Sequence, residues 1–242
     1  MAGARAVEAV VLRSFRYGEA DRVLHLLTRE RGRVGAVAKG VRRTRSRVGG
    51  RLEPLSHVEV VLHSGRGELA TVGSVELLDS AEAVRGDPYR LGVALVGVEA
   101  VTRLFPEPDE PNASLFDGLL RFLTVAGELP AGAVGEPARD GVSLGFALKL
   151  LALAGWAPRL DACAGCGNDV PLVGYDVVAG GATCAACGGF AVRPDALQAV
   201  HDLLARPLGA AGTSDGAATS QVLRIVRESI GAHASHGLRT LG

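Results

Sequence analysis

Two pairs of cysteines carry the most specific chemistry in this sequence. Cys163 and Cys166 form one C-x2-C pair, Cys184 and Cys187 form another, and 17 residues separate the two pairs. Four thiolates at this spacing are the ligand set of a structural zinc site, because each C-x2-C turn supplies two sulfurs to one tetrahedral ion. No position stays open for catalysis, so we predict one structural Zn2+ that closes an insertion at about residues 160–192. The alternatives are a redox dithiol, which needs only one pair, or four unrelated core cysteines.

A run of cations between residues 29 and 51 is the second group that could do chemistry. It holds nine basic residues and one acid in a chain whose 26 basic and 26 acidic residues cancel. The nine are Arg29, Arg31, Arg33, Lys39, Arg42, Arg43, Arg45, Arg47 and Arg51. Such a charge attracts polyanions, and the planar arginine fork grips phosphate in two places. We therefore predict that these nine residues bind nucleic acid, with a solvated loop that serves only solubility as the alternative.

Two features favour binding over mere solubility. Gly40, Gly49 and Gly50 let the backbone approach a ligand closely. Patterned apolar segments lie on both sides of the run, as expected for a loop held by a folded domain. The cysteine region differs, because residues 161–187 contain no lysine or arginine and so lack electrostatic attraction for nucleic acid.

The aromatic residues limit how nucleic acid could be bound. Residues 1–80 contain only Phe15 and Tyr17, which are too few for a stacking platform of many bases. The same region carries 14 basic and nine acidic residues, whereas the rest of the chain is net negative. We therefore expect binding through phosphate contacts, without sequence preference, to both single and double strands.

Length and composition exclude several classes of protein. A chain of 242 residues with 48% hydrophobic residues can bury a sizeable core in one or two domains and is not a disordered protein. The first residues lack the apolar core of a signal peptide, and the longest uncharged apolar runs, 91–98 and 150–157, are too short to span a bilayer. Four cysteines are too few for a disulfide-stapled scaffold. We expect a soluble, cytoplasmic protein.

The hydrophobic pattern changes near residue 80. Before it, five short runs rich in Val and Leu predict strands at residues 7–15, 22–28, 33–39, 57–63 and 70–78. The longest connection lies between the third and fourth, and it contains most of the basic run. Five strands with this connection favour a small closed barrel of the OB type, although a five-stranded SH3-like barrel stays open.

After residue 80 the pattern predicts helices at about residues 88–105, 112–126, 138–154, 194–205 and 220–233. Asp87-Pro88 and Asn112 have the residue types of helix starts. The expected fold class is α+β, with an OB-type barrel at residues 1–80 and a helical domain at residues 81–242 that carries the four-cysteine zinc module.

One motif suggests an enzyme. Gly141-Val-Ser143-Leu-Gly145 matches the G-x-S-x-G elbow of hydrolases, which needs a buried strand directly before the serine. Residues 135–140 are instead polar and contain a proline, and Ser143 lies inside a helical pattern. A small residue at a helix–helix contact is the favoured interpretation, and a hydrolase is the alternative.

As a set, several stretches resemble the bacterial recombination and DNA-repair family RecO. They are residues 8–13, 17–22, 27–32, 38–43 with 46–47, 154–158, 160–163 and 233–241. The resemblance covers nearly the whole chain and implies an OB barrel, a helical domain and, in many members, a zinc module. It also implies a non-enzymatic mediator on the nucleoid that binds DNA, anneals complementary strands and works with RecR. Together they would help RecA displace single-stranded-DNA-binding protein.

A second hypothesis uses the same residues. An RNA- or ribosome-associated OB-fold zinc protein would share the basic run and the structural zinc. Comparing annealing of complementary DNA with RNA binding would separate the two hypotheses.

Overall fold

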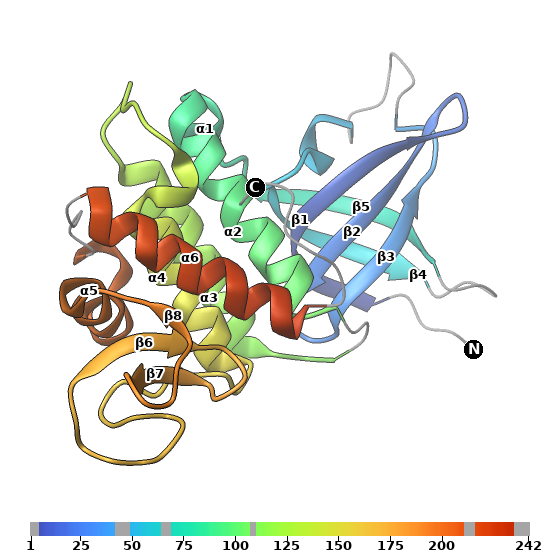
Figure 1. Ribbon diagram of the computed structural model, residues 1–242. Helices are drawn as coiled ribbons and strands as arrows, with labels where there is room; N and C mark the ends of the chain where they lie inside the picture. Colours follow the sequence, from blue (N-terminus) through green and yellow to red (C-terminus); the bar gives the residue numbers. More distant parts are fainter. Residues whose placement is uncertain (1–4, 42–48, 64–68, 107–109, 211–215, 235–242) are drawn as a thin grey trace. The chain divides into compact units, whose positions relative to one another are not determined.

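The computed structural model describes residues 5–41, 49–63, 69–106, 110–210 and 216–234 (Figure 1). Packing divides the chain into two compact units, and each consists of two stretches of sequence. The barrel unit comprises Met1–Gly86 and Pro106–Gly127, and the helical unit comprises Asp87–Phe105 and Glu128–Gly242. The chain therefore leaves the barrel unit, returns to it once, and leaves again.

Five strands close into a barrel in the order β1-β2-β3-β5-β4. They are β1 (Arg5–Tyr17), β2 (Asp21–Thr28), β3 (Gly32–Ala38), β4 (His57–His63) and β5 (Ala70–Asp79). All neighbours pair antiparallel except β3 and β5, which pair in parallel. The predicted strands and the OB-type barrel are thus confirmed.

The barrel closes because its strands alternate. In β3, Val34, Ala36 and Ala38 are buried in the core while the residues between them are half-buried. This period of two is what places one face of a strand against a core. Val41 and Leu52 also belong to the core cluster, so apolar side chains anchor both ends of the segment between β3 and β4.

Strand β1 contains an irregularity that changes which side chains face outward. Val11 pairs with Leu26, but the next aligned pair is Arg13 with His25, so β1 has one extra residue there. Such a bulge reverses the facing of all later side chains in the strand. Val7, Ala9 and Val11 point into the core, whereas Arg13 and the later alternate residues lie outside it.

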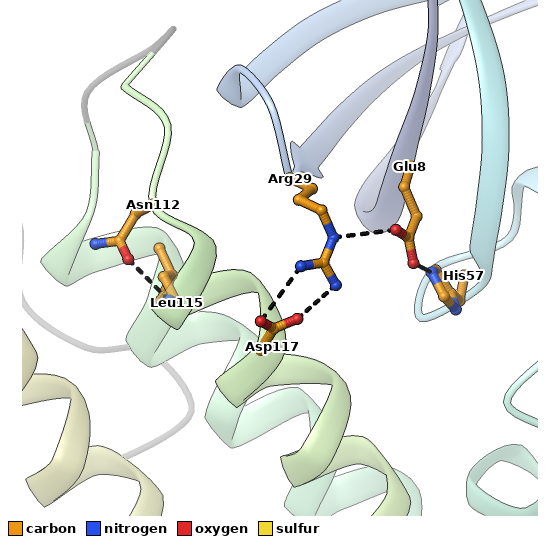
Figure 2. Close-up of polar contacts among 6 residues, drawn as sticks. All are labelled: Glu8, Arg29, His57, Asn112, Leu115 and Asp117. Atoms are coloured by element: carbon orange, nitrogen blue, oxygen red, sulfur yellow. Dashed lines mark hydrogen bonds and ion pairs between the residues drawn. The ribbon is translucent and has the colours of Figure 1, made fainter.

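Helix α3 (Ala113–Glu128) belongs to the barrel unit although its sequence follows α2. Figure 2 shows how a single arginine binds it. Arg29 Nε donates to Glu8 Oε2 at 3.1 Å, and the two Nη atoms donate to the Asp117 carboxylate at 2.5 and 3.3 Å. The same guanidinium lies 4.9 Å from the centre of the Phe116 ring. His57 Nε2 contacts the other Glu8 oxygen at 2.7 Å and meets Phe116 edge to face.

The helical unit is built around one apolar helix. Its elements are α2 (Pro88–Leu104), α4 (Gly141–Leu153), α5 (Pro194–Ala205) and α6 (Gly216–His233). Ten of the 13 residues of α4 are buried, so it is apolar on all sides and forms the centre that the other helices cover. A short sheet with order β7-β6-β8 lies in the cysteine region, formed by β6 (Leu172–Asp176), β7 (Gly181–Cys184) and β8 (Phe190–Ala191).

The remaining elements are short. Helix α1 (Glu82–Arg85) follows the barrel, and 3-10 turns lie at η1 (Gly49–Leu52), η2 (Pro137–Arg139) and η3 (Leu208–Ala210). The five long helices were predicted to within a few residues. The sheet in the cysteine region and the short turns were not.

Two aspartates hold helix starts in the helical unit. The Asp87 side chain accepts hydrogen bonds from the backbone N–H groups of Tyr89, Arg90 and Gly132 at 2.7 to 3.0 Å. Asp140 accepts one from the Val142 N–H and one from the Tyr89 hydroxyl at 2.8 Å. These donors stabilise the charged carboxylate, and the Gly132 N–H is the main reason that the pKa of Asp87 lies below its ordinary value.

We predict that Asp87→Asn lowers the denaturant midpoint of unfolding at neutral pH, because the amide cannot accept all three hydrogen bonds. Since the folded pKa of Asp87 is depressed, its contribution is complete above the ordinary value of 3.8 and is lost as the pH falls through the folded pKa. Urea unfolding of both proteins from pH 7 to pH 3 tests this. The difference should shrink at acidic pH, and a constant difference would contradict the role of the charge.

Candidate functional site

Strand β3 separates the basic run into two groups. Arg29 and Arg31 lie in the turn from β2 and Arg33 is the second residue of β3, whereas Lys39 follows the end of the strand. A strand of this length, seven residues, spans roughly 20 Å. Among the described cations, Arg29, Arg31 and Arg33 therefore lie at the opposite end of the strand from Lys39.

The cations near the β2–β3 turn contact α3 and the segment that leads into it. Arg29 is bound to Glu8 and Asp117, and Arg33 Nη1 donates to the carbonyl oxygen of Pro106 at 3.0 Å. A side chain at Gly32 would lie 2.0 Å from the backbone oxygen of Glu110, so only glycine permits this approach. At this end the cations serve contacts within the barrel unit.

At the other end of β3, the chain enters the basic loop, which we define as residues 39–51. The Lys39 side chain is exposed. The Gly40 N–H donates to Asp21 Oδ1 at 2.8 Å, which ties the start of the loop to the β1–β2 hairpin (Figure 1). Arg42, Arg43, Arg45 and Arg47 lie outside the described residues.

The return of the basic loop is equally well held. A side chain at Gly49 would lie 2.5 Å from the Val41 carbonyl oxygen, so the two ends of the loop meet closely. Arg51 Nη1 donates to the Val75 carbonyl oxygen at 2.8 Å, and Leu52 is fully buried. The two described ends of the loop are thus both fixed to the barrel.

Charge counting alone missed a group of exposed side chains beside this loop. Arg13, Phe15 and Tyr17 lie on one side of β1, which we call the hairpin face, and the exposed residue Arg16 lies on the other side of the strand. Among the residues that the structure describes, Arg13, Arg16 and Lys39 form no ion pair. Their alternate positions in a predicted strand were the only available signal, and the bulge that turns them outward cannot be read from local pattern.

His25 pairs with Arg13 across the two strands and packs edge to face against Phe15, with ring centres 5.5 Å apart. Burial, followed by the charges of Arg33 and Arg13, lowers the pKa of His25. Its imidazole is therefore uncharged at neutral pH and supports the Phe15 ring as a flat, neutral neighbour.

The four cysteines come together as their spacing predicted. Their sulfur atoms all lie within 4.8 Å of one another, with Cys163 and Cys184 buried. The short sheet positions them, because Cys184 ends β7 and its N–H donates to Cys163 Sγ at 3.3 Å. Gly167 and Gly188, which follow Cys166 and Cys187, have positive φ angles of 78° and 79°, which lets the two turns close tightly.

Four thiolates this close would repel one another, and a cation between them would offset that repulsion. Backbone N–H groups of Cys166 and Cys184 lower the pKa of Cys163 to about 6. The sulfurs of Cys163, Cys184 and Cys166, which share the Cys187 proton, raise the pKa of Cys187 to about 12. The Cys163 thiol therefore ionises more readily than an ordinary cysteine, and the Cys187 thiol less readily. A positive charge at the centre of the cluster would favour ionisation of all four. The donor set fits a metal ion.

The serine motif has no hydrolase geometry. Ser143 is the third residue of α4, whose start is capped by Asp140, and the 3-10 turn η2 precedes it in place of a strand. Its side chain is buried among apolar residues. The prediction that Ser143 lies in a helix is confirmed.

The comparisons with known proteins place this chain in a class of DNA-repair proteins. Residues 1–81 match the family described as Recombination protein O N terminal, and residues 85–242 match Recombination protein O C terminal. The chain therefore belongs to the RecO family of DNA-repair proteins. It is 40% identical over 233 residues to the DNA repair protein RecO of Rubrobacter xylanophilus, a match that covers 93% of this chain and 90% of that protein. No helix among the described residues is long and apolar enough to cross a membrane.

We predict that Arg29→Ala lowers the thermal unfolding temperature, because Asp117 and Glu8 then lose their shared cation. Asp117→Asn should cost less in the Arg29→Ala background than in the original protein, which a double-mutant cycle measures. The matched control is Lys39→Ala, which removes an exposed cation with no ion pair and should leave the unfolding temperature unchanged. Additive effects of Arg29 and Asp117 would contradict their coupling.

Proposed function

We propose that this protein is a non-enzymatic recombination mediator that binds DNA without sequence preference and anneals complementary strands. In this proposal it acts with RecR on the nucleoid, in the cytoplasm, and helps RecA replace single-stranded-DNA-binding protein. The observation that carries the proposal is membership in the RecO family over nearly the whole chain. The OB-type barrel with its basic loop is the physical feature that fits it.

The basic loop is the first phosphate-binding element in this proposal. Its six cations are Lys39, Arg42, Arg43, Arg45, Arg47 and Arg51. Val41 and Leu52, near the two ends of the loop, belong to the barrel core, so a polyanion can be bound without disturbing the fold. Arg29 binds Asp117 of α3. Arg31 and Arg33 remain predicted nucleic-acid contacts, but the proposal does not depend on them.

Phosphate contacts suit an annealing protein. They carry no sequence information, so two complementary strands are bound equally well whatever their sequence. Base pairing itself then selects the partner strand, and the protein needs only to offset the repulsion between two phosphate backbones. Both single and double strands are ligands of such a surface. The family match to a DNA repair protein favours DNA over the RNA- or ribosome-associated alternative.

We also propose that the metal ion is Zn2+ and that its role is structural. An all-thiolate set of four ligands suits tetrahedral zinc and leaves no position for a substrate. The ion would join the turn at Cys163 and Cys166 to the end of β7. The insertion also packs on the helical unit, where the Tyr175 hydroxyl lies 3.3 Å from Ser229 Oγ of α6.

DNA binding should depend strongly on salt. If about six cations engage single-strand phosphates, the slope of log K against log salt is roughly −4, and raising salt from ~50 to ~200 mM weakens binding by two to three orders of magnitude. Replacing Arg42, Arg43, Arg45 and Arg47 together by alanine should reduce the slope to about −1 to −2. Titrations on unrelated DNA sequences at several salt concentrations measure it.

The matched control for that variant replaces four exposed arginines of the helical unit, Arg139, Arg159, Arg206 and Arg224, by alanine. Net charge changes equally, but the slope should stay near that of the original protein. An unchanged slope in the loop variant would show that the contact surface lies elsewhere. Annealing of DNA coated with its binding protein, with and without RecR, tests the mediator role, and no stimulation of annealing would defeat it.

Purified protein should contain one zinc ion per chain, and Cys184→Ser should remove it and lower the unfolding temperature. DNA affinity should persist, because residues 161–187 carry no cation. Val178→Ser is the control, since this side chain is 99% exposed in the same insertion and should change neither zinc nor stability. Elemental analysis, thermal unfolding and DNA titration measure the three properties. A folded Cys184→Ser protein that no longer binds DNA would indicate a direct contact by this region.

A further inference from the structure

The bulge in β1 gives the barrel an unusual surface. Without the extra residue, the alternation of Val7, Ala9 and Val11 would continue inward at Phe15 and Tyr17. With it, their aligned partners are Val23 and Asp21, which lie on the outer side of β2. Phe15 is 47% exposed and Tyr17 is 60% exposed, although aromatic rings of this size gain most from burial. The one extra residue of the bulge thus turns both aromatic rings toward solvent.

Beside these two rings lie cations that form no ion pair with any residue that the structure describes. Arg13 precedes Phe15 on the same side of β1, and Lys39 lies near the hairpin through the Gly40–Asp21 contact. An exposed apolar surface for a protein partner would have little need of such cations. Aromatic rings interleaved with unpaired positive charge are the combination that binds the bases and phosphates of one strand.

We infer that the hairpin face is a base-stacking site for single-stranded DNA, in which Phe15 and Tyr17 pack against unpaired bases while Arg13 and Lys39 bind the adjoining phosphates. This inference rests on the proposed function and names the form of DNA that the barrel prefers. Side chains two apart on a strand are roughly 7 Å from each other, so each ring has room for its own base. The edge-to-face contact with His25 fixes the Phe15 ring in advance.

A preference for single-stranded DNA follows from how bases stack. In a duplex, the flat faces of the bases are stacked on one another and cannot reach a side chain. In a single strand, the faces are free, and every base has one, so stacking needs no sequence preference. Phosphate contacts bind both forms, and the two rings add affinity for only one. An annealing protein with this property holds strands before pairing more tightly than the duplex it produces, so the product is released.

The experiment compares binding of oligo(dT) and of a duplex of equal length to the full-length protein at several salt concentrations. Phe15→Leu/Tyr17→Leu, which keeps apolar bulk but removes the rings, should weaken oligo(dT) binding by roughly ten- to a hundredfold. Duplex affinity and the salt slope of oligo(dT) binding should stay unchanged, because no charge is removed. Tyr17→Phe should retain affinity. Leu78→Ala, an exposed aliphatic residue of β5, is the control and should change nothing.

A second measurement does not depend on affinity. Oligo(dT) carrying 5-iodouracil should photo-crosslink to Phe15 or Tyr17. Peptide mass spectrometry identifies the crosslinked residue. Any one of three results would overturn the inference alone. They are an unchanged oligo(dT) affinity in a folded double-leucine variant, equal losses of affinity for both DNA forms, and crosslinks confined to other residues. An unmodified protein that binds neither DNA form would overturn the proposed function as well.

Discussion

The contact of Arg29 with Glu8 and Asp117 is the interaction on which the barrel unit depends. It joins strand β1, the β2–β3 turn and helix α3. Asp117 of α3 lies 88 positions after Arg29 along the chain. A charged arginine suits this position because its planar fork satisfies both oxygens of one carboxylate while its Nε reaches a second. The Phe116 ring beneath it excludes water from one side and strengthens the attraction. One side chain thereby fixes where the chain re-enters the unit.

Local features of the sequence were sufficient to predict most elements. Alternation in β3 and the caps at Asp87 and Asn112 depend on neighbours within a few positions, so a reading of short windows finds them. The cysteine cluster was equally predictable, because the spacing of Cys163 to Cys187 already contains the geometry of its turns. The family resemblance agreed with both, and the comparisons confirmed it.

Features that depend on long-range register were not predictable. The bulge after Val11 exists only in relation to β2, and the docking of α3 depends on a partner far away in sequence. Counting charges likewise ignores the direction of a strand, so it does not show that Arg29 and Lys39 lie at opposite ends of β3. Within the same run, Arg29 forms ion pairs inside the barrel unit while Lys39 is exposed. A cation's neighbours in space, and not its neighbours in sequence, decide whether it is paired.

The alternation of the chain between its two units has a consequence for the order of folding. The ribosome releases the N-terminus first, and strand β5 ends at Asp79, well before helix α3 begins at Ala113. Until that helix is translated, the nascent barrel has Glu8 and Arg29 without Asp117, and the surface that receives Phe116 is open to water. Helix α2, made in between, must wait longer still, because α4 and α6 of its own unit come last. Neither unit can finish folding as a contiguous stretch of newly made chain, so the two maturation steps are linked in time.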